Sequence, residues 1–427
     1  MLGAIGLSSL DDLFDQIPAS VRLDGGLDLP AGVSEHEILD DLGALARANR
    51  STDDLVCFAG SGAYDHEVPS VVWALAGRSE FATSYTPYQP ELSQGVLQAL
   101  FEFQSMICEL TAMDVSNASL YDGATALVEA VNMARSAKTG RVVVLDTVDP
   151  RFIDTLSTYG RGAGYRPEVV ARPAGGAAGD ELGEGTAALV VQHPNLYGTL
   201  EDVRGLSQVA HGAGAKLIQV FDPMSLGVLA PPGELGADIA VAEGQPLGNH
   251  LQYGGPYLGL IAARMDDVRR MPGRIVGETV DVDGRTGYVL TLQAREQHIR
   301  REKATSNICT NQTLMAIAAT IHLAWLGPEG LREVGERCAA KAAYAFGRLT
   351  AIDGVTAARP GEPFFKEFGV RLPRAAADVR DELLDHGYLA GVPAPGERDV
   401  LLVAVTERRS RAEIDGLADA VEKVIAT

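Results

Sequence analysis

Cysteine is scarce in this chain, with four residues among 427 (Cys57, Cys108, Cys309 and Cys338). They form no CxxC pair, and no histidine stands at zinc-ligand spacing from them. A disulfide framework and a structural zinc site both need more thiols at closer spacing. The pattern therefore predicts a reducing compartment, buried inert thiols and no metal.

Positive charge and long apolar runs are also in short supply. The chain has 36 basic and 57 acidic residues and a net charge of −21, which repels nucleic-acid phosphates and anionic lipids. The longest apolar stretch, 314–326, is interrupted by Thr320 and His322 and falls short of the roughly 20 residues that a bilayer requires. No Lys or Arg precedes Asp11, as a secretory signal would require. We expect a soluble, cytoplasmic protein that binds neither nucleic acid nor membranes.

The hydrophobic pattern divides the chain into three parts. Residues 1–70 are expected to form an N-terminal helical extension, with a short amphipathic helix at 11–17 and a second helix from a Ser34–Glu37 capping box to about Asn49. Such an extension is suited to wrapping a partner subunit. Residues 71–320 alternate β-branched runs with helical stretches, and residues 321–427 mix helices with short strands.

These runs predict an α/β fold with a mainly parallel sheet, followed by a small C-terminal α+β domain. The predicted strands of the sheet are 141–146, 187–192, 216–221, 238–242 and 257–262, and the helices between them include 124–137 and 200–212. Helices at 311–326, 329–349, 375–386 and 411–425 and strands at 364–372 and 400–405 are expected after them. Ligands of such sheets bind beyond the carboxyl ends of the strands.

Four stretches carry a resemblance to a known family. Residues 83–95 (TSYTPYQPELSQG), 194–202 (PNLYGTLED), 253–259 (YGGPYLG) and 295–310 (REQHIRREKATSNICT) resemble the N-terminal half of glycine cleavage system P-proteins, in the same order. The chain has about half the length of the single-chain form. The resemblance therefore implies the alpha subunit of the two-subunit form.

The resemblance also implies a fold and an activity. The fold would be that of aspartate aminotransferase, pyridoxal-phosphate fold type I. The enzyme would be glycine dehydrogenase (aminomethyl-transferring, decarboxylating), an oxidoreductase that decarboxylates glycine and passes the aminomethyl group to the lipoyl group of H-protein. This chain would pair with a homologous beta subunit as an α2β2 heterotetramer and would be inactive alone. The alternative is a non-catalytic scaffold or regulatory pseudoenzyme subunit.

The loop 83–95 is the first candidate site. Two prolines stiffen it, and its polar and aromatic side chains offer hydrogen-bond donors, acceptors and ring faces. The resemblance makes it part of a shared active-site wall at the subunit interface, formed by Tyr85, Thr86, Tyr88, Gln89, Glu91 and Ser93. The residues alone also allow a structural loop whose tyrosines are buried.

A second candidate is a vestigial cofactor or anion site. Asp122, Gly123, Ala124 and Thr125 open a predicted helix, whose free N–H groups and positive end suit an anion. Related enzymes place the cofactor phosphate there, and they place the aspartate that pairs with the pyridine nitrogen at the position of Asp222. An ordinary capped helix and an ordinary strand-end turn explain the same residues.

The lysine that such a cofactor needs is missing from its expected place. The chain has six lysines, and the first after Asp222 is Lys303, 81 positions on. The stretch 242–250, where the family's catalytic subunit carries its lysine, has none, and Asp149 stands where relatives often have histidine. We therefore expect pyridoxal phosphate on the partner subunit, and no residue here is predicted to be an acid, base or nucleophile.

Other interpretations make different predictions. An autonomous decarboxylase would have to recruit Lys303. His298 and the charged residues around it suit either an anion site or an ion-paired structural segment. A nucleotide-binding protein is not favoured, since no GxGxxG or GxxxxGK[ST] motif follows a predicted strand.

Overall fold

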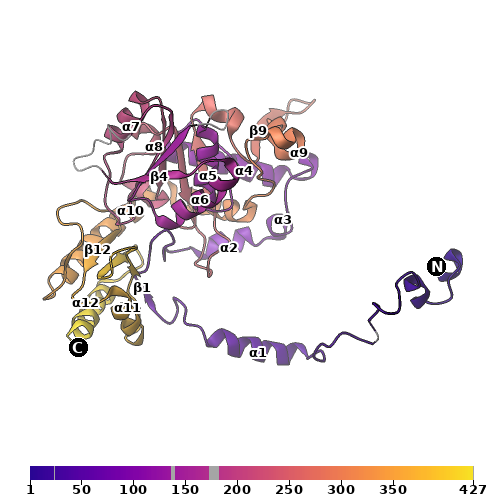
Figure 1. Ribbon diagram of the computed structural model, residues 1–427, viewed down its shortest axis with the longest axis horizontal. Coiled ribbons are helices and arrows are strands. Elements are labelled where there is room, and N and C mark those ends of the chain that lie inside the picture. Colours follow the sequence, from indigo (N-terminus) through magenta and orange to yellow (C-terminus); the bar gives the residue numbers. More distant parts are fainter. Residues whose placement is uncertain (24, 136–139, 173–181, 427) are drawn as a thin grey trace. The chain divides into compact units, whose positions relative to one another are not determined.

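The computed structural model describes residues 1–23, 25–135, 140–172 and 182–426, and these divide into two units, Met1–Ser51 and Thr52–Thr427 (Figure 1). The first unit contains two 3₁₀ helices, η1 (Leu2–Ile5) and η2 (Asp11–Phe14), and the helix α1 (Glu35–Arg47). The Ser34–Glu37 capping box is present at the start of α1, as predicted. The predicted helix at 11–17 is only the 3₁₀ turn η2. None of these three elements has a buried residue.

The extension ends at Ser51 and not at residue 70. Strand β1 (Val56–Cys57) pairs in parallel with β13 (Tyr388–Leu389). The N–H groups of Val56 and Phe58 donate to the carbonyl oxygens of Gly387 and Leu389. Residues 52–69 therefore belong with the C-terminal part of the chain, through pairing that joins positions more than 300 residues apart.

The second unit is built on a seven-stranded sheet. Its strands are β2 (Val115–Ser116), β3 (Arg141–Leu145), β4 (Pro167–Val170), β5 (Thr186–His193), β6 (Lys216–Phe221), β7 (Ile239–Glu243) and β8 (Gly259–Ala263). The order is β2-β8-β7-β6-β5-β3-β4. Strands β4, β3, β5, β6 and β7 run parallel. Strand β8 runs antiparallel to β7, and β2 runs antiparallel to β8. The five predicted strands and the α/β fold class are confirmed.

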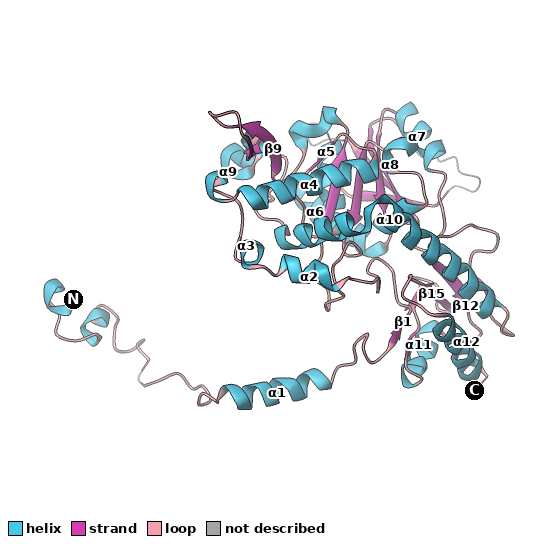
Figure 2. Ribbon diagram, turned by 180° about the vertical axis from the view of Figure 1, so that it is seen from behind, coloured by secondary structure: helices cyan, strands magenta, loops and turns pink. Residues whose placement is uncertain are grey.

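Helices cover both faces of this sheet. Alternate residues of each strand point to opposite faces, so that Val143 and Leu145 join one core cluster while Val142 and Val144 join the other. The first face is covered by α4 (Gln94–Thr111), α7 (Val203–Gly212) and the first half of α10 (Thr313–Thr350) (Figure 2). The second face is covered by α5 (Gly123–Ala134) and α6 (Pro150–Ala163). The end predicted for α5, at Ala137, lies outside the described residues.

Helix α10 combines two helices that the sequence predicts separately. The backbone breaks at Gly327 (φ 61°, ψ 179°), and Pro328 follows, which accounts for the kink. Among the described helices, α10 is the one long and apolar enough to cross a membrane by length and composition. Half of its most apolar window is buried, and its first half packs in the core, so it is a core helix.

A four-stranded antiparallel sheet follows α10, in the order β11-β12-β15-β14. Its strands are β11 (Thr356–Ala357), β12 (Glu367–Arg371), β14 (Val392–Pro393) and β15 (Val400–Ala404). They pack with α11 (Ala376–Asp385), α12 (Arg411–Ile425) and the second half of α10 around a separate core.

The remaining elements are short. They are α2 (Ser70–Ala76), α3 (Ser79–Ala82), η3 (Pro90–Leu92), η5 (Pro223–Gly227), α8 (Pro232–Leu235), η6 (Met265–Arg270), the hairpin β9 (Ile275–Val280) and β10 (Thr286–Thr291), η7 (Gln293–Arg295), α9 (Gln297–Arg300) and η8 (Arg301–Lys303).

Candidate functional site

A small pocket lies where the parallel strands end. Residues that follow β3, β5, β6 and β7 line it, together with Lys366 and Glu367 from the start of β12. This is the edge at which α/β sheets bind ligands. The cavity volume is about 50 Å³, which is room for about four water molecules at ~10–15 Å³ each.

Asp222 forms an ion pair with Lys366 at the floor of this pocket. The Nζ–Oδ2 distance is 2.7 Å, and the exposed fractions of the two side chains are 1% for lysine and 13% for aspartate. Asp222 follows β6, as the sequence predicts, and its other oxygen accepts from the N–H of Met224 at 3.0 Å. The carboxylate is therefore satisfied within the chain.

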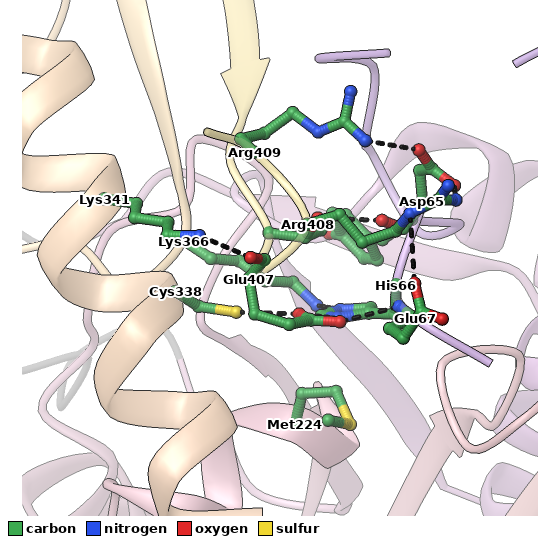
Figure 3. Close-up of polar contacts among 12 residues, drawn as sticks. Asp65, His66, Glu67, Met224, Cys338, Lys341, Lys366, Glu407, Arg408 and Arg409 are labelled. Carbon is green, nitrogen blue, oxygen red and sulfur yellow. Dashed lines mark hydrogen bonds and ion pairs between the residues drawn. The ribbon is translucent and has the colours of Figure 1, made fainter. Parts of the chain in front are cut away.

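A chain of polar contacts holds Lys366 in place. Its Nζ lies 2.8 Å from Nε2 of His66 and 3.7 Å from the centre of the Tyr64 ring. Burial and the neighbouring ammonium lower the pKa of His66, so the imidazole is neutral. Its Nε2 then accepts from Lys366, and its Nδ1–H donates to Glu407 at 2.7 Å. Lys341, which projects from α10, donates to the backbone carbonyl of Glu407 (Figure 3).

A second carboxylate occupies the start of α5. Glu243, at the end of β7, accepts from the backbone N–H of Gly123 at 3.0 Å. Its other oxygen accepts from the N–H groups of Gln245 and Leu258, each at 3.0 Å. Burial raises the pKa of Glu243 to about 7, while the three N–H groups favour the charged form. A carboxyl group of the chain itself, ionised above about pH 7, thus lies at the positive end of this helix.

Glu367 closes the side of the pocket formed by the small sheet. It accepts from the Tyr64 hydroxyl at 2.9 Å and from the N–H of Ser61 at 2.8 Å. Burial raises the pKa of Glu367 to about 7, and burial beside this carboxyl raises the pKa of Tyr64 well above its ordinary range. Residues 61–66 therefore form part of the site, although no motif in the sequence predicts it.

His66, Cys338 and Glu407 lie within 4.8 Å of one another (Figure 3), a geometry that permits a metal ion. The chemistry opposes one. Burial raises the pKa of the Cys338 thiol far above its usual range, and a metal binds the thiolate. The Nδ1 atom of His66 is already hydrogen bonded to Glu407, and the Lys366 ammonium lies 2.8 Å from the same ring. The cluster is best described as a hydrogen-bonded support for Lys366.

The residues predicted for a vestigial anion site take local structural roles. Asp122 caps α5 by accepting from the N–H of Thr125 at 2.8 Å, and a reciprocal bond completes a capping box. A Cβ atom at Gly123 would lie 2.7 Å from the backbone nitrogen of Glu243, so close packing against β7 requires the glycine. Ala124 follows it in the first turn of α5.

The loop 83–95 lies at the surface and does not line this pocket. Tyr85 and Tyr88 are 73% and 61% exposed, and the Arg274 guanidinium lies 5.2 Å from the centre of the Tyr88 ring. Gln89 and Glu91 are exposed, and Thr86 and Ser93 are partly buried. The structure thus separates the two predicted sets of site residues. It also rules out the alternative of a loop whose tyrosines are buried.

The segment 295–303 mixes structural and exposed residues. Arg295 donates to the carbonyl oxygens of Met271 and Gly273, which fixes the segment to the loop after η6. Lys303 and His298 are exposed, and neither lines the pocket beside Asp222. A role for Lys303 as a cofactor lysine at that site is therefore excluded.

Sequence reasoning missed three central residues, Lys366, Glu243 and His66. Lys366 lies 144 positions after Asp222 in the chain and reaches it from a segment next to a different sheet, so no local pattern connects the two. Glu243 carries one signal in the sequence, a strand-end carboxylate followed by glycine. His66 carries none, since the pattern predicts that residues 52–69 belong to the extension.

Pyridoxal phosphate, the cofactor that the resemblance implies, does not fit these residues. Its phosphate requires free N–H groups at a helix start, and Glu243 already accepts from that of Gly123. Its ring nitrogen requires a free aspartate, and Asp222 is paired with Lys366. That lysine is itself engaged by Asp222 and His66, so it is not free to bind the cofactor covalently.

Comparison with known proteins gives consistent matches. The family model described as "Glycine cleavage system P-protein" matches residues 1–421. A protein of Moorella thermoacetica named "Probable glycine dehydrogenase (decarboxylating) subunit 1" is 51% identical, covering 100% of this chain and 97% of its own. A protein of the same name from Thermomicrobium roseum is 48% identical with the same coverage.

Solved structures agree with these matches. A crystal structure of glycine decarboxylase (P-protein) of the glycine cleavage system, in inhibitor-bound form, superposes with a TM-score of 0.93 at 45% identity and covers 99% of this chain and 97% of its own. An aspartate aminotransferase from Thermus thermophilus superposes with a TM-score of 0.59 at 19% identity, over 87% of this chain and 99% of its own. The second match shows the fold alone and confirms the predicted aspartate-aminotransferase-like class.

Proposed function

The chain belongs to the glycine cleavage system P-protein family, and from this premise we propose that it is the cofactor-free subunit of a two-subunit glycine decarboxylase. It is a subunit of the glycine-decarboxylating enzyme, as its relatives are named. The partner subunit carries pyridoxal phosphate, which supplies the electron sink for decarboxylation. One observation supports placing the cofactor on the partner. In this chain, Lys366 already pairs with Asp222, and Glu243 already accepts from the N–H of Gly123 at the start of α5.

The exposed loop 83–95 supplies this chain's part of the shared active site. Two tyrosines that are 73% and 61% exposed, on a loop stiffened by Pro87 and Pro90, are suited to contact with a partner. Their hydroxyls offer hydrogen bonds, and their rings exclude water, which strengthens electrostatic interactions inside a closed site. Thr86, Gln89, Glu91 and Ser93 complete this wall.

The assembly is an α2β2 heterotetramer in the cytoplasm that acts on glycine and on the lipoyl group of H-protein. Ile38, Leu42 and Leu45 of α1 are 40%, 55% and 67% exposed, which supports docking of the extension on a partner subunit. Within the second unit, residues 71–320 act as the large domain and 321–427 as the small one. Lys366, which directly precedes β12 of the small domain, forms an ion pair with Asp222 of the large domain, so this contact joins the two domains at the pocket.

The proposal is tested by expressing this chain alone, the partner subunit alone, and both together. Each preparation receives pyridoxal phosphate and lipoylated H-protein. Visible absorbance and the exchange of the glycine carboxyl with labelled bicarbonate are then recorded. We expect full exchange only from the pair, and no cofactor absorbance from this chain alone. Exchange by this chain alone would contradict the proposal.

A double variant, Tyr85→Ala with Tyr88→Ala, separates a shared active site from a scaffold. We expect the purified pair to keep its cofactor absorbance and to lose exchange by at least about tenfold, since truncation of such an aromatic contact costs about 2 kcal/mol. The matched control is Tyr159→Ala, an exposed tyrosine on α6 that lies outside the loop. Normal assembly and normal exchange in the double variant would support the scaffold.

A further inference from the structure

The pocket presents two charged groups of the chain, one at each end. At one end the Lys366 ammonium lies 2.7 Å from Asp222. At the other end the Glu243 carboxylate accepts from the N–H of Gly123 at 3.0 Å. The Lys366 side chain is buried and Glu243 is partly buried, and β6 and β7, which lead to the two acidic residues, are neighbours in the sheet.

These two groups match the charges of pyridoxal phosphate. That cofactor offers a phosphate anion to a helix start and a protonated ring nitrogen to an aspartate. Glu243 offers an anion to the start of α5, and Lys366 offers an N–H⁺ donor to Asp222. The hydrogen-bond role agrees at both ends, and the sign of the charge at the Glu243 end agrees above about pH 7, where this carboxyl is ionised.

We propose that Lys366 and Glu243 are permanent internal substitutes for the cofactor, so that this site folds and stays closed without a ligand. The proposal rests on the proposed function only in that the partner carries the cofactor. It explains how the fold retains Asp222 and the helix start although the lysine at the site is not free to bind the cofactor covalently. Without these side chains, Asp222 would lose its ion-pair partner and keep only the N–H of Met224, and the N–H of Gly123 would lose its acceptor, which is costly.

The support around each side chain indicates a fixed role. Lys366 is positioned by His66, which Glu407 holds in turn, and the lysine side chain is 1% exposed. Glu243 makes three backbone hydrogen bonds at 3.0 Å from three separate segments. Both residues line the pocket, and each is engaged by hydrogen bonds or ion pairs within the chain.

Chemical rescue tests the proposal at the anion end. Glu243→Ala, in the full chain at pH 8, should bind inorganic phosphate at the N–H groups that it frees. At a phosphate concentration about 100-fold above Kd, the Tm of this variant should rise by about 3 °C relative to chloride of equal ionic strength. Glu243→Gln keeps an acceptor oxygen and is the matched control. It should respond as the wild type does.

Chemical rescue also tests the cation end. Lys366→Ala removes three carbon atoms and the ammonium group, which n-propylammonium replaces. This ion should raise the Tm of Lys366→Ala by a few degrees, whereas tetramethylammonium, with the same charge and no N–H, should not. Lys341→Ala is the control, because it removes a different lysine, one that donates to the backbone carbonyl of Glu407. Neither ion should raise the Tm of this variant.

The outcomes distinguish the possible failures. Equal responses of the wild type and the variants to the matching ions would overturn the proposal. If Lys366→Ala does not fold, Lys366→Met combined with Asp222→Asn should fold, and failure of this uncharged pair would also overturn it. A wild-type chain that becomes coloured with pyridoxal phosphate refutes the placement of the cofactor on the partner. A colourless wild type without rescue of the variants refutes the internal substitution alone.

Discussion

Replacing Lys366 by methionine removes the charge at the floor of the pocket and keeps most of the side-chain volume. Asp222, 13% exposed, then loses its 2.7 Å partner, and Nε2 of His66 loses a donor. Breaking a buried ion pair on one side costs about 3–5 kcal/mol. The lower end of this range applies to Asp222, because its carboxylate still accepts from the N–H of Met224 and keeps some contact with solvent. We therefore expect a loss of about 3 kcal/mol.

Calorimetric unfolding of the full chain measures this loss. The unfolding entropy of a unit as large as Thr52–Thr427 is roughly 0.8 kcal/mol per kelvin, so that 3 kcal/mol corresponds to a fall of about 4 °C in Tm. The cycle with Asp222→Asn isolates the pair, since the double variant leaves no buried charge unpaired. We expect a coupling of about 1–3 kcal/mol. Additive effects, or a Lys366→Met chain as stable as the wild type, would refute the ion pair as a source of stability.

Other properties follow from the same structure. Burial raises the pKa of Glu243 from 4.5 to about 7. Its contribution to the free energy of unfolding is therefore present below about pH 4.5 and is lost as the pH rises through 7. In urea titrations, the wild type should lose about 3 kcal/mol relative to Glu243→Gln between pH 5 and 8, and a pH-independent difference would contradict this. Gly198→Ala should cost about 3 kcal/mol or more by the same assay, since φ is +75° and a Cβ would lie 1.8 Å from a carbonyl oxygen of β12. Gly347→Ala, a helical site with open space around the new Cβ, should be neutral or stabilising, and equal losses in both variants would refute the reasoning. Cys309, exposed, should react with a thiol reagent long before buried Cys338, and equal rates would indicate an open core.

The sequence was sufficient for the elements of the sheet. The five β-branched runs appear as β3, β5, β6, β7 and β8, because continuous apolar stretches between helices are typical of buried parallel strands. The strands β2 and β4 were missed. They have two and four residues, too few for a periodic pattern to show.

The candidate site was predicted only in part. Asp222 follows β6 and Asp122 caps α5, as their neighbours in the sequence predict. The partners of these groups were not found. Lys366 reaches Asp222 from another sheet, and the alignment of the two sheets comes from core packing that no local pattern records. The roles proposed for the 83–95 loop depend on a second subunit, which no single-chain pattern describes.

Borohydride reduction of the assembled enzyme tests the central claim most directly. Reduction fixes pyridoxal phosphate to the lysine that holds it, and peptide mass spectrometry identifies that lysine. Our account predicts a label on the partner subunit and on none of the six lysines of this chain. A label on this chain, at Lys366 above all, would contradict it.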